Sequence, residues 1–367
     1  MKSVDKIQRN SNIELLRVVS MSFIVMGHFI SQTNSFENHK GVYRFFTYLF
    51  GSGARIAVNI FLIIGVWFLV DSKFSAKRIM KLYAQLWFYV FPLSIISFFI
   101  KPEIGFDFKA LLPLLSSRLW FVSSYMVLLV LAPFMQPIFR SDYEYQKRLV
   151  IIMTIIIPLM SLVHIGSDSY LDALIWFIYV YIVVGFIKYN GRHLKLYLKR
   201  VYFPKIYFIL TISIYMILVF IRMYYKDVTV GLGRFLYGIA FGILTDYKTF
   251  FNFAIALFVF LFVVSRKARY DKVVNRVAKS TLSVYIIHQV PAFYPILWSD
   301  VFLADIWTAS NYLFIGLFGI VIVLYLLAIM LDCLFEILFR KLLKGSAVLA
   351  IVEKINVFYE RLFETRN

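Results

Sequence analysis

The chain has 367 residues, of which 61% are hydrophobic, 19% aromatic and 16% charged. A soluble domain carries about 25% charged residues, so this composition excludes a water-soluble globule and favours a protein embedded in a bilayer. The basic residues behind the net charge of +19 fall in short segments between apolar runs, which indicates membrane topology and not nucleic-acid binding.

Apolar runs long enough to cross about 30 Å of hydrocarbon as helices recur along the chain. The predicted spans are residues 13–32, 53–70, 81–100, 119–139, 149–166, 171–187, 203–223, 248–265, 281–298 and 311–339. The first run contains charged residues and has no small-residue cleavage site, so it is interpreted as a retained span and not as a signal peptide. The sequence therefore predicts an all-α polytopic membrane bundle of about ten transmembrane helices.

The distribution of Lys and Arg predicts the orientation of this bundle. With the N-terminus inside, the cytoplasmic segments hold about 27 Lys and Arg and the outer segments about 10, which agrees with the positive-inside rule. Residues 231–247 are apolar as well, but an eleventh span there would place the basic loop from Arg266 to Lys279 outside. We therefore expect a short helix at the outer face, and both termini in the cytoplasm.

The chain shows no internal repeat and no long linker, so we expect one membrane domain over residues 1–339. Residues 340–367 mix basic and apolar residues at helical spacing, and are predicted to form a basic amphipathic cytoplasmic tail. A helix along the inner leaflet and a solvated surface helix both fit this pattern. The single cysteine, Cys333, excludes an intramolecular disulfide.

The first span contains the most polar side chains. Glu14, Arg17 and His28 lie within its apolar run, and eleven residues, about three helical turns, separate Arg17 from His28. Both are therefore expected on one face, with Arg17 at the inner surface and His28 about 16 Å deeper along one passage. The alternative is that Arg17 reaches lipid phosphate and His28 packs against a neighbouring helix.

Two further groups of polar residues are candidates. Arg78 and Lys81 precede the third span three residues apart, where they can bind a phosphate together or serve only as positive-inside anchors. Tyr285 and His288 share a face of the ninth span, as reactive groups or as buried packing residues. Trp120 begins the fourth span, where tryptophan is common as an interfacial anchor. No histidine has a metal-ligand neighbour at useful spacing, and no soluble nucleotide-binding or hydrolase motif occurs.

Taken together, these residues resemble the membrane acyltransferase-3 family. Arg17 and His28 match the family's arginine and histidine in the first span, and Arg78 and Lys81 match its Arg-x-x-Arg motif, with lysine in the second place. The blocks AVNIFLIIGVWFLV at 57–70 and STLSVYIIHQ at 280–289 also look like the family. Ile64 stands where many members have serine, and Lys81 lacks the bidentate fork of arginine.

The resemblance implies an O-acetyltransferase of the bacterial cytoplasmic membrane, with acetyl-CoA as donor and a surface glycan or lipid-linked sugar as acceptor. The hypothesis is that Arg17, Arg78 and Lys81 bind the CoA phosphates and that His28 acts as general base, and no metal is expected to take part. Glu14, Trp120, Tyr285 and His288 are secondary candidates. The competing interpretation is a glycan flippase or exporter, which would not release free CoA.

Overall fold

The computed structural model describes residues 9–32, 40–104, 112, 117–163, 170–191, 203–309, 312–343 and 345–363. Within these ranges every regular element is a helix, as expected where lipid leaves backbone groups no partner except one another. The α-helices are α1 (Ser11–Gln32), α3 (Gly41–Leu69), α4 (Ala76–Ile100), α5 (Trp120–Met135), α6 (Tyr143–Val163), α7 (Tyr170–Tyr189), α9 (Phe203–Tyr224), α10 (Gly231–Thr245), α11 (Phe250–Val264), α12 (Lys272–Lys279), α13 (Thr281–Gln289), α14 (Ala304–Ala309), α15 (Leu313–Leu342) and α16 (Ser346–Phe363). Short 3-10 helices are η1 (Pro102–Ile104), η4 (Ser117–Leu119) and η5 (Gln136–Arg140), and η6 (Ile296–Val301) is a π-helix.

The described helices confirm the polytopic all-α membrane architecture. Seven are long and apolar enough to cross a bilayer, and α10 with α11 forms a pair bent by 55° that makes an eighth if it is one span. The predicted span at 149–166 belongs to α6, and its last residues, 164–166, lie outside the described ranges. The chain is therefore a multi-pass membrane protein, with fewer established crossings than the ten predicted.

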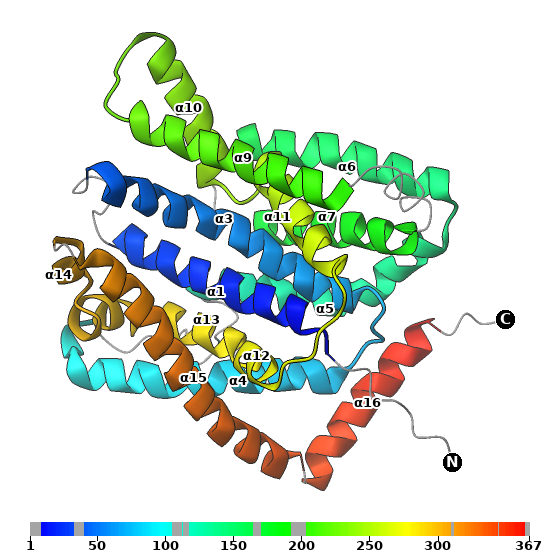
Figure 1. The fold of residues 1–367 in the computed structure, drawn as a ribbon. Helices are drawn as coiled ribbons and strands as arrows, with labels where there is room; N and C mark the ends of the chain where they lie inside the picture. Colours follow the sequence, from blue (N-terminus) through cyan, green and yellow to red (C-terminus); the bar gives the residue numbers. More distant parts are fainter. Residues whose placement is uncertain are drawn as a thin grey trace.

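The predicted ninth span, residues 281–298, is not one helix. Helix α13 ends at Gln289, and the π-helix η6 begins only at Ile296. Pro291 explains the break, because proline lacks a backbone donor and disfavours the helical conformation in the residue before it. Residues 231–247, predicted as a short helix, do form one, α10, which Figure 1 shows extending away from the rest of the bundle.

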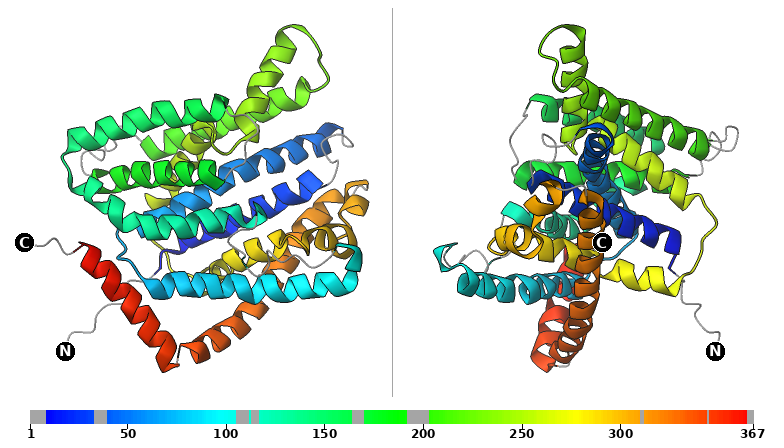
Figure 2. Two further views of the ribbon diagram at one scale, coloured as in Figure 1. Left: turned by 180° about the vertical axis from the view of Figure 1, so that it is seen from behind. Right: turned by 60° about the vertical axis from the view of Figure 1, so that its left-hand side comes forward.

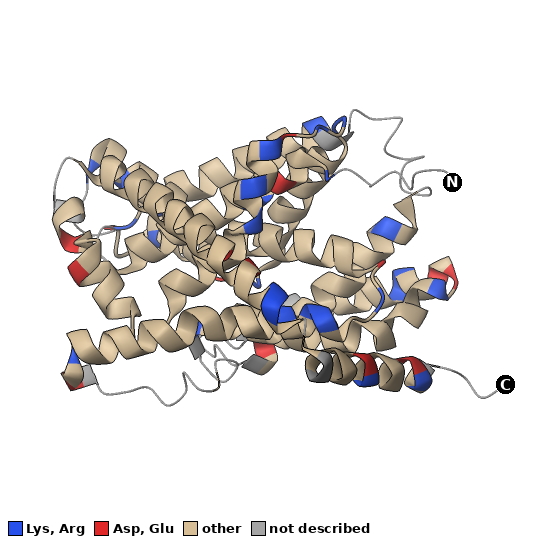
Figure 3. Ribbon diagram, turned by 90° about the horizontal axis from the view of Figure 1, so that it is seen from below, with Lys and Arg blue, Asp and Glu red and all other residues tan. Residues whose placement is uncertain are grey.

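Helix α3 lies in the middle of the bundle, where it packs against α1, α7, α9 and α11. Figures 1 and 2 show α1 beside it, with α13, α4 and α15 on the other side of α1. Helix α1 begins and α15 ends at the same end of the bundle (Figure 1). Many Lys and Arg residues lie toward this end (Figure 3), and we call it the basic end.

The last helix, α16, packs on the start of α4. Asn356 accepts a hydrogen bond from the backbone N–H of Ala76 at 2.9 Å, and so satisfies one of the free donors at the helix N-terminus. The Tyr359 ring stacks on Phe74 with ring centroids 3.5 Å apart. The tail is thus a helix anchored at the basic end, and its position along the inner leaflet stays a prediction.

Candidate functional site

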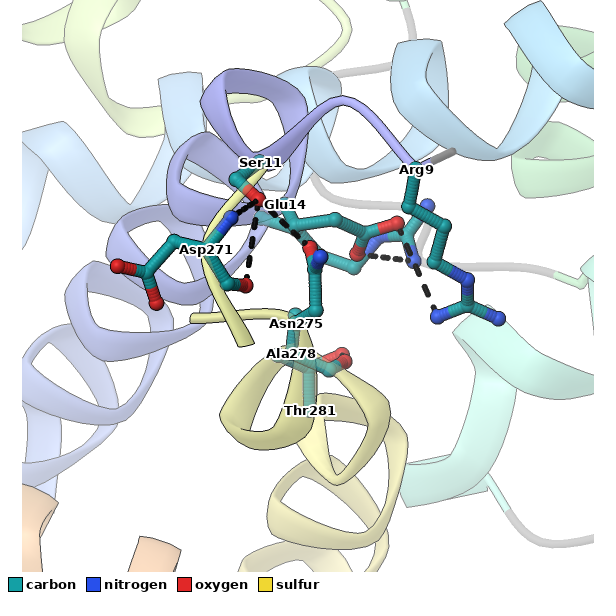
Figure 4. Close-up of polar contacts among 8 residues, drawn as sticks. Arg9, Ser11, Glu14, Asp271, Asn275, Ala278 and Thr281 are labelled. Carbon is teal, nitrogen blue, oxygen red and sulfur yellow. Dashed lines mark hydrogen bonds and ion pairs between the residues drawn. The ribbon is translucent and has the colours of Figure 1, made fainter. Parts of the chain in front are cut away.

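The start of α1 is fixed to α12 by hydrogen bonds that place the first polar residues of the span. Ser11 Oγ donates to Asn275 Oδ1 at 3.0 Å and accepts from the backbone N–H of Asp271 at 2.6 Å (Figure 4). The backbone N–H of Ser11 also donates to the Arg269 carbonyl at 2.8 Å. These contacts join segments far apart in the sequence and hold the N-terminal turn of α1 at the basic end.

Glu14 fixes the guanidinium of Arg17. The Glu14 carboxylate is buried and accepts a hydrogen bond from Arg17 Nη1 at 3.0 Å, while Arg9 approaches its other oxygen at 4.0 Å. The side chain of Arg17 keeps 21% of its surface exposed. Glu14, predicted as a secondary candidate, therefore has a structural role in orienting Arg17, which remains accessible.

A cavity of about 790 Å³ opens among α1, α3, α4, α5, α12, α13 and α15, and Arg17 lines it. Its basic lining residues are Arg9, Arg17, Lys81, Arg276, Lys279 and Arg340, and its acidic ones are Asp332 and Glu336. This excess of cations makes the cavity suited to an anionic ligand, because clefts lined by one sign of charge concentrate ions of the opposite sign. The volume falls within the usual range for small-molecule sites, about 300–1,000 Å³.

Arg78 and Lys81 do not meet at this cavity as predicted. Lys81 lines it and forms an ion pair with Glu336. Arg78 is exposed and lines a smaller pocket beside it, which is also formed by Ser75 and Ala132. The two side chains diverge although both belong to the first turns of α4, so the structure does not show a joint phosphate clasp.

His28 and His288 lie next to each other, with ring centroids 5.3 Å apart. His288 is fully buried, and its Nδ1 is 2.6 Å from the carbonyl oxygen of Val284. Because a carbonyl only accepts, Nδ1 carries the proton and Nε2 of the neutral ring presents a lone pair. That Nε2 has no hydrogen-bond partner among the described residues. His28 and His288, both predicted as site candidates on different helices, therefore form a pair.

Two aromatic rings separate the cavity from the histidine pair. Phe121 lines the cavity and contacts the Tyr285 ring at 5.9 Å between centroids, and Tyr285 in turn contacts His288 at 6.0 Å. The Tyr285 hydroxyl donates to the Arg118 carbonyl at 3.2 Å. His28 is not among the residues that line the cavity, so this cavity does not form the passage predicted to join it to Arg17.

Trp120 lies at the start of α5, and its ring stacks on Tyr247 with centroids 5.0 Å apart. Tyr247 belongs to the break between α10 and α11. There Asn59 donates to its carbonyl at 2.7 Å, and Trp176 donates to Asn59 at 2.9 Å. Trp120 thus packs against the α10–α11 break, and reaches the histidine pair only indirectly, through the rings of Phe121 and Tyr285.

Sequence reasoning missed a carboxylate in the wall of the cavity. Asp332 Oδ1 accepts hydrogen bonds from Ser283 at 2.6 Å, from Tyr89 at 2.8 Å and from Gln85 at 3.4 Å. These donors stabilise a charge inside an apolar span, where an isolated carboxylate is costly. The signal was present in the sequence, because Asp332 interrupts the apolar run at 311–339.

Two arginines near His28 were also missed. Both Arg55, on α3, and Arg118, in η4, interact electrostatically with the His28 imidazole. The predicted second span began at residue 53, which placed Arg55 at its outer edge. The observed helix begins at Gly41, so Arg55 is its central residue.

Comparison with known families matches residues 10–330 to the acyltransferase domain. Curated proteins and solved structures gave no significant match. The matched range runs from the residue before α1 into α15, and includes the cavity residues from Arg17 to Ile329 as well as both histidines. Among the described residues, no group of three or more His, Cys, Asp or Glu could hold a metal ion.

Proposed function

The chain belongs to the acyltransferase 3 family and is therefore an acyltransferase; we propose that it moves an acetyl group from cytoplasmic acetyl-CoA to a hydroxyl of a cell-surface glycan or its lipid-linked precursor. His28 acts as the general base. The membrane is the bacterial cytoplasmic membrane, with the basic end facing the cytoplasm, in agreement with the positive-inside rule.

The observation that carries this proposal is the position of the cationic cavity. It lies at the basic end, and its wall at Phe121 is separated from the His28–His288 pair by the Tyr285 ring. CoA is a polyanion of the cytoplasm with a long thioester arm. A cavity with six basic residues suits its phosphates, and the arm extends from there toward the histidines.

Of the three residues predicted from the sequence to bind the CoA phosphates, Arg17 and Lys81 are the proposed ligands, because both line the cavity. Glu14 keeps Arg17 oriented toward the ligand, and Arg276 and Arg340 add charge from α12 and α15. Arg78 joins this site less directly. It lines the smaller pocket and not this cavity, so its part in donor binding stays a prediction.

The chemistry follows from the histidine pair. The acceptor oxygen attacks the thioester carbonyl carbon, the C–S bond breaks, and the proton of the hydroxyl passes to His28 and then to the departing CoA thiolate. A positioned general base contributes about 10²- to 10⁴-fold to such a step. The proposal requires Tyr285 to move, because its ring and that of Phe121 lie between the cavity and the pair.

The test uses the full-length protein in nanodiscs with acetyl-labelled acetyl-CoA and a panel of bacterial surface oligosaccharides. We expect labelled glycan and free CoA in equal amounts, and a His28→Ala variant that binds the donor but transfers at least about 100-fold more slowly. Undiminished transfer by His28→Ala would contradict the role of His28. Glycan movement without CoA release would contradict the enzymatic proposal and favour a carrier.

A further inference from the structure

Helices α1 and α3 approach each other closely at Gly27, the residue before His28. A Cβ atom on Gly27 would lie 2.3 Å from the Cβ of Ala54, so glycine is required where the two helices cross. Small residues at such a crossing let two backbones approach closely inside a membrane. His28 follows Gly27 on α1, and Arg55 follows Ala54 on α3. The crossing therefore brings the backbone positions of His28 and Arg55 close together.

Arg55 lies in an unusual position for a charged residue. It is the central residue of a 29-residue helix, about 20 Å from either end, and is exposed between the buried residues Ala54 and Ile56. It forms no ion pair with any described carboxylate. An arginine at the middle of a span is costly, and marks a functional site by default.

A second cation adds to the charge around His28. The guanidinium of Arg118 lies 3.7 Å above the Tyr294 ring, and it also forms no ion pair within the described ranges. Among the described residues, the titratable and charged groups that act on His28 are thus all basic: Arg55 from α3, Arg118 from η4 and His288 from α13. Such a site attracts an anion.

The donor does not supply this anion in the proposed arrangement. Its phosphates belong to the cavity at the basic end, which neither Arg55 nor Arg118 lines. The second substrate can supply it. Building on the proposed function, we infer that the acceptor carries an anionic group, a carboxylate or a phosphate, beside the hydroxyl that is acylated, and that Arg55 binds this group.

The experiment compares three oligosaccharides of equal length with the full-length protein in nanodiscs: a galacturonate oligomer, a sugar-phosphate oligomer and a neutral galactose oligomer. Acetyl transfer and equilibrium binding are both measured. We expect the wild type to bind and acylate at least one anionic oligomer about 10- to 100-fold better than the neutral one, as a charge-assisted hydrogen bond predicts. The two anionic oligomers distinguish carboxylate from phosphate.

Variants test whether Arg55 causes the preference for anionic oligomers. Arg55→Gln should remove it, and Arg55→Lys should retain part of it. Arg44→Gln is the matched control, because Arg44 lies on the same helix but pairs with Asp227 at 3.1 Å; it should behave as the wild type. Equal use of the three oligomers by the wild type, or an equal loss for all of them in Arg55→Gln, would overturn the inference.

The binding measurement separates this inference from the proposed function. Preferential binding of an anionic oligomer that Arg55→Gln abolishes, without any acetyl transfer, would support the anion site and contradict the acetyltransferase. Acetyl transfer to all three oligomers at the same rate would support the acetyltransferase and contradict the anion site.

Discussion

The cavity at the basic end and the histidine site beyond Tyr285 both gather basic side chains, but their charges are balanced in different ways. In the cavity, Arg17 pairs with Glu14 and Lys81 pairs with Glu336. Around His28, neither Arg55 nor Arg118 pairs with a described carboxylate.

This difference suits the two regions to different tasks. Partly neutralised and accessible cations can take up and release a large polyanion, because each contact with it is modest. Unbalanced cations beside the histidine pair suit charge that arrives with the substrate or develops during the reaction, where low polarity strengthens each interaction. Variants of the two regions should therefore differ in the kinetic constant that they change.

The largest effect is expected at the histidine site. His288→Phe keeps the ring but removes the Nε2 lone pair that can hold the proton of His28, so kcat should fall about 100-fold with little change in donor KM. His288→Gln offers an amide oxygen as acceptor and should recover part of the rate. Equal losses in both variants, accompanied by lower melting temperatures, would make His288 a packing residue.

A substitution at the α1–α3 crossing should disturb the histidine site without changing any residue of the cavity. Gly27→Ala forces a methyl group against Ala54, which should cost about 1–3 kcal/mol of stability and lower kcat, because His28 and Arg55 separate. The thermal midpoint and transfer rate of the purified protein test this.

Two controls accompany the Gly27 variant. The double variant Gly27→Ala/Ala54→Gly should recover both properties. Gly242→Ala should change neither, because nothing lies within 4 Å of the added Cβ. Failure of the double variant to recover would show that the clash is not the cause.

A smaller effect is expected in the cavity. Arg17→Gln removes one of six basic lining residues, so the KM for acetyl-CoA should rise about tenfold while kcat stays near the wild-type value. Arg234→Gln, an exposed arginine on α10, is the control. A fall in kcat without a change in KM would place Arg17 in the chemical step. It would contradict the assignment of donor binding to the cavity and chemistry to the histidine site.

The smallest effect is expected from a carboxylate of the cavity. Glu336→Gln releases Lys81 from its ion pair, so the affinity for acetyl-CoA should rise about two- to threefold, and the gain should disappear at high salt. Glu353→Gln on α16 serves as control. Weaker donor binding after Glu336→Gln would mean that Glu336 orients Lys81 toward the ligand.

The sequence was sufficient to predict the features that depend on the local hydrophobic pattern and on residue type. The apolar runs predict the helices, and Arg17, His28 and His288 were recognisable as polar side chains inside them. Contacts between distant segments were not predictable in this way, because the Gly27–Ala54 crossing and the Ser11–Asn275 hydrogen bond depend on the packed fold. Arg55 was missed for a local reason, since a helix twelve residues longer at its start moved it from an edge to the centre.

A single-turnover experiment tests the central claim most directly. The protein is loaded with acetyl-labelled acetyl-CoA, mixed with acceptor, and the label is followed for the wild type and for His28→Asn at matched donor occupancy. The account predicts that the variant holds the donor with wild-type affinity while the label stays on CoA. Label that reaches the glycan at the wild-type rate, or a donor affinity that falls with the rate, would contradict the separation of donor binding from acyl transfer.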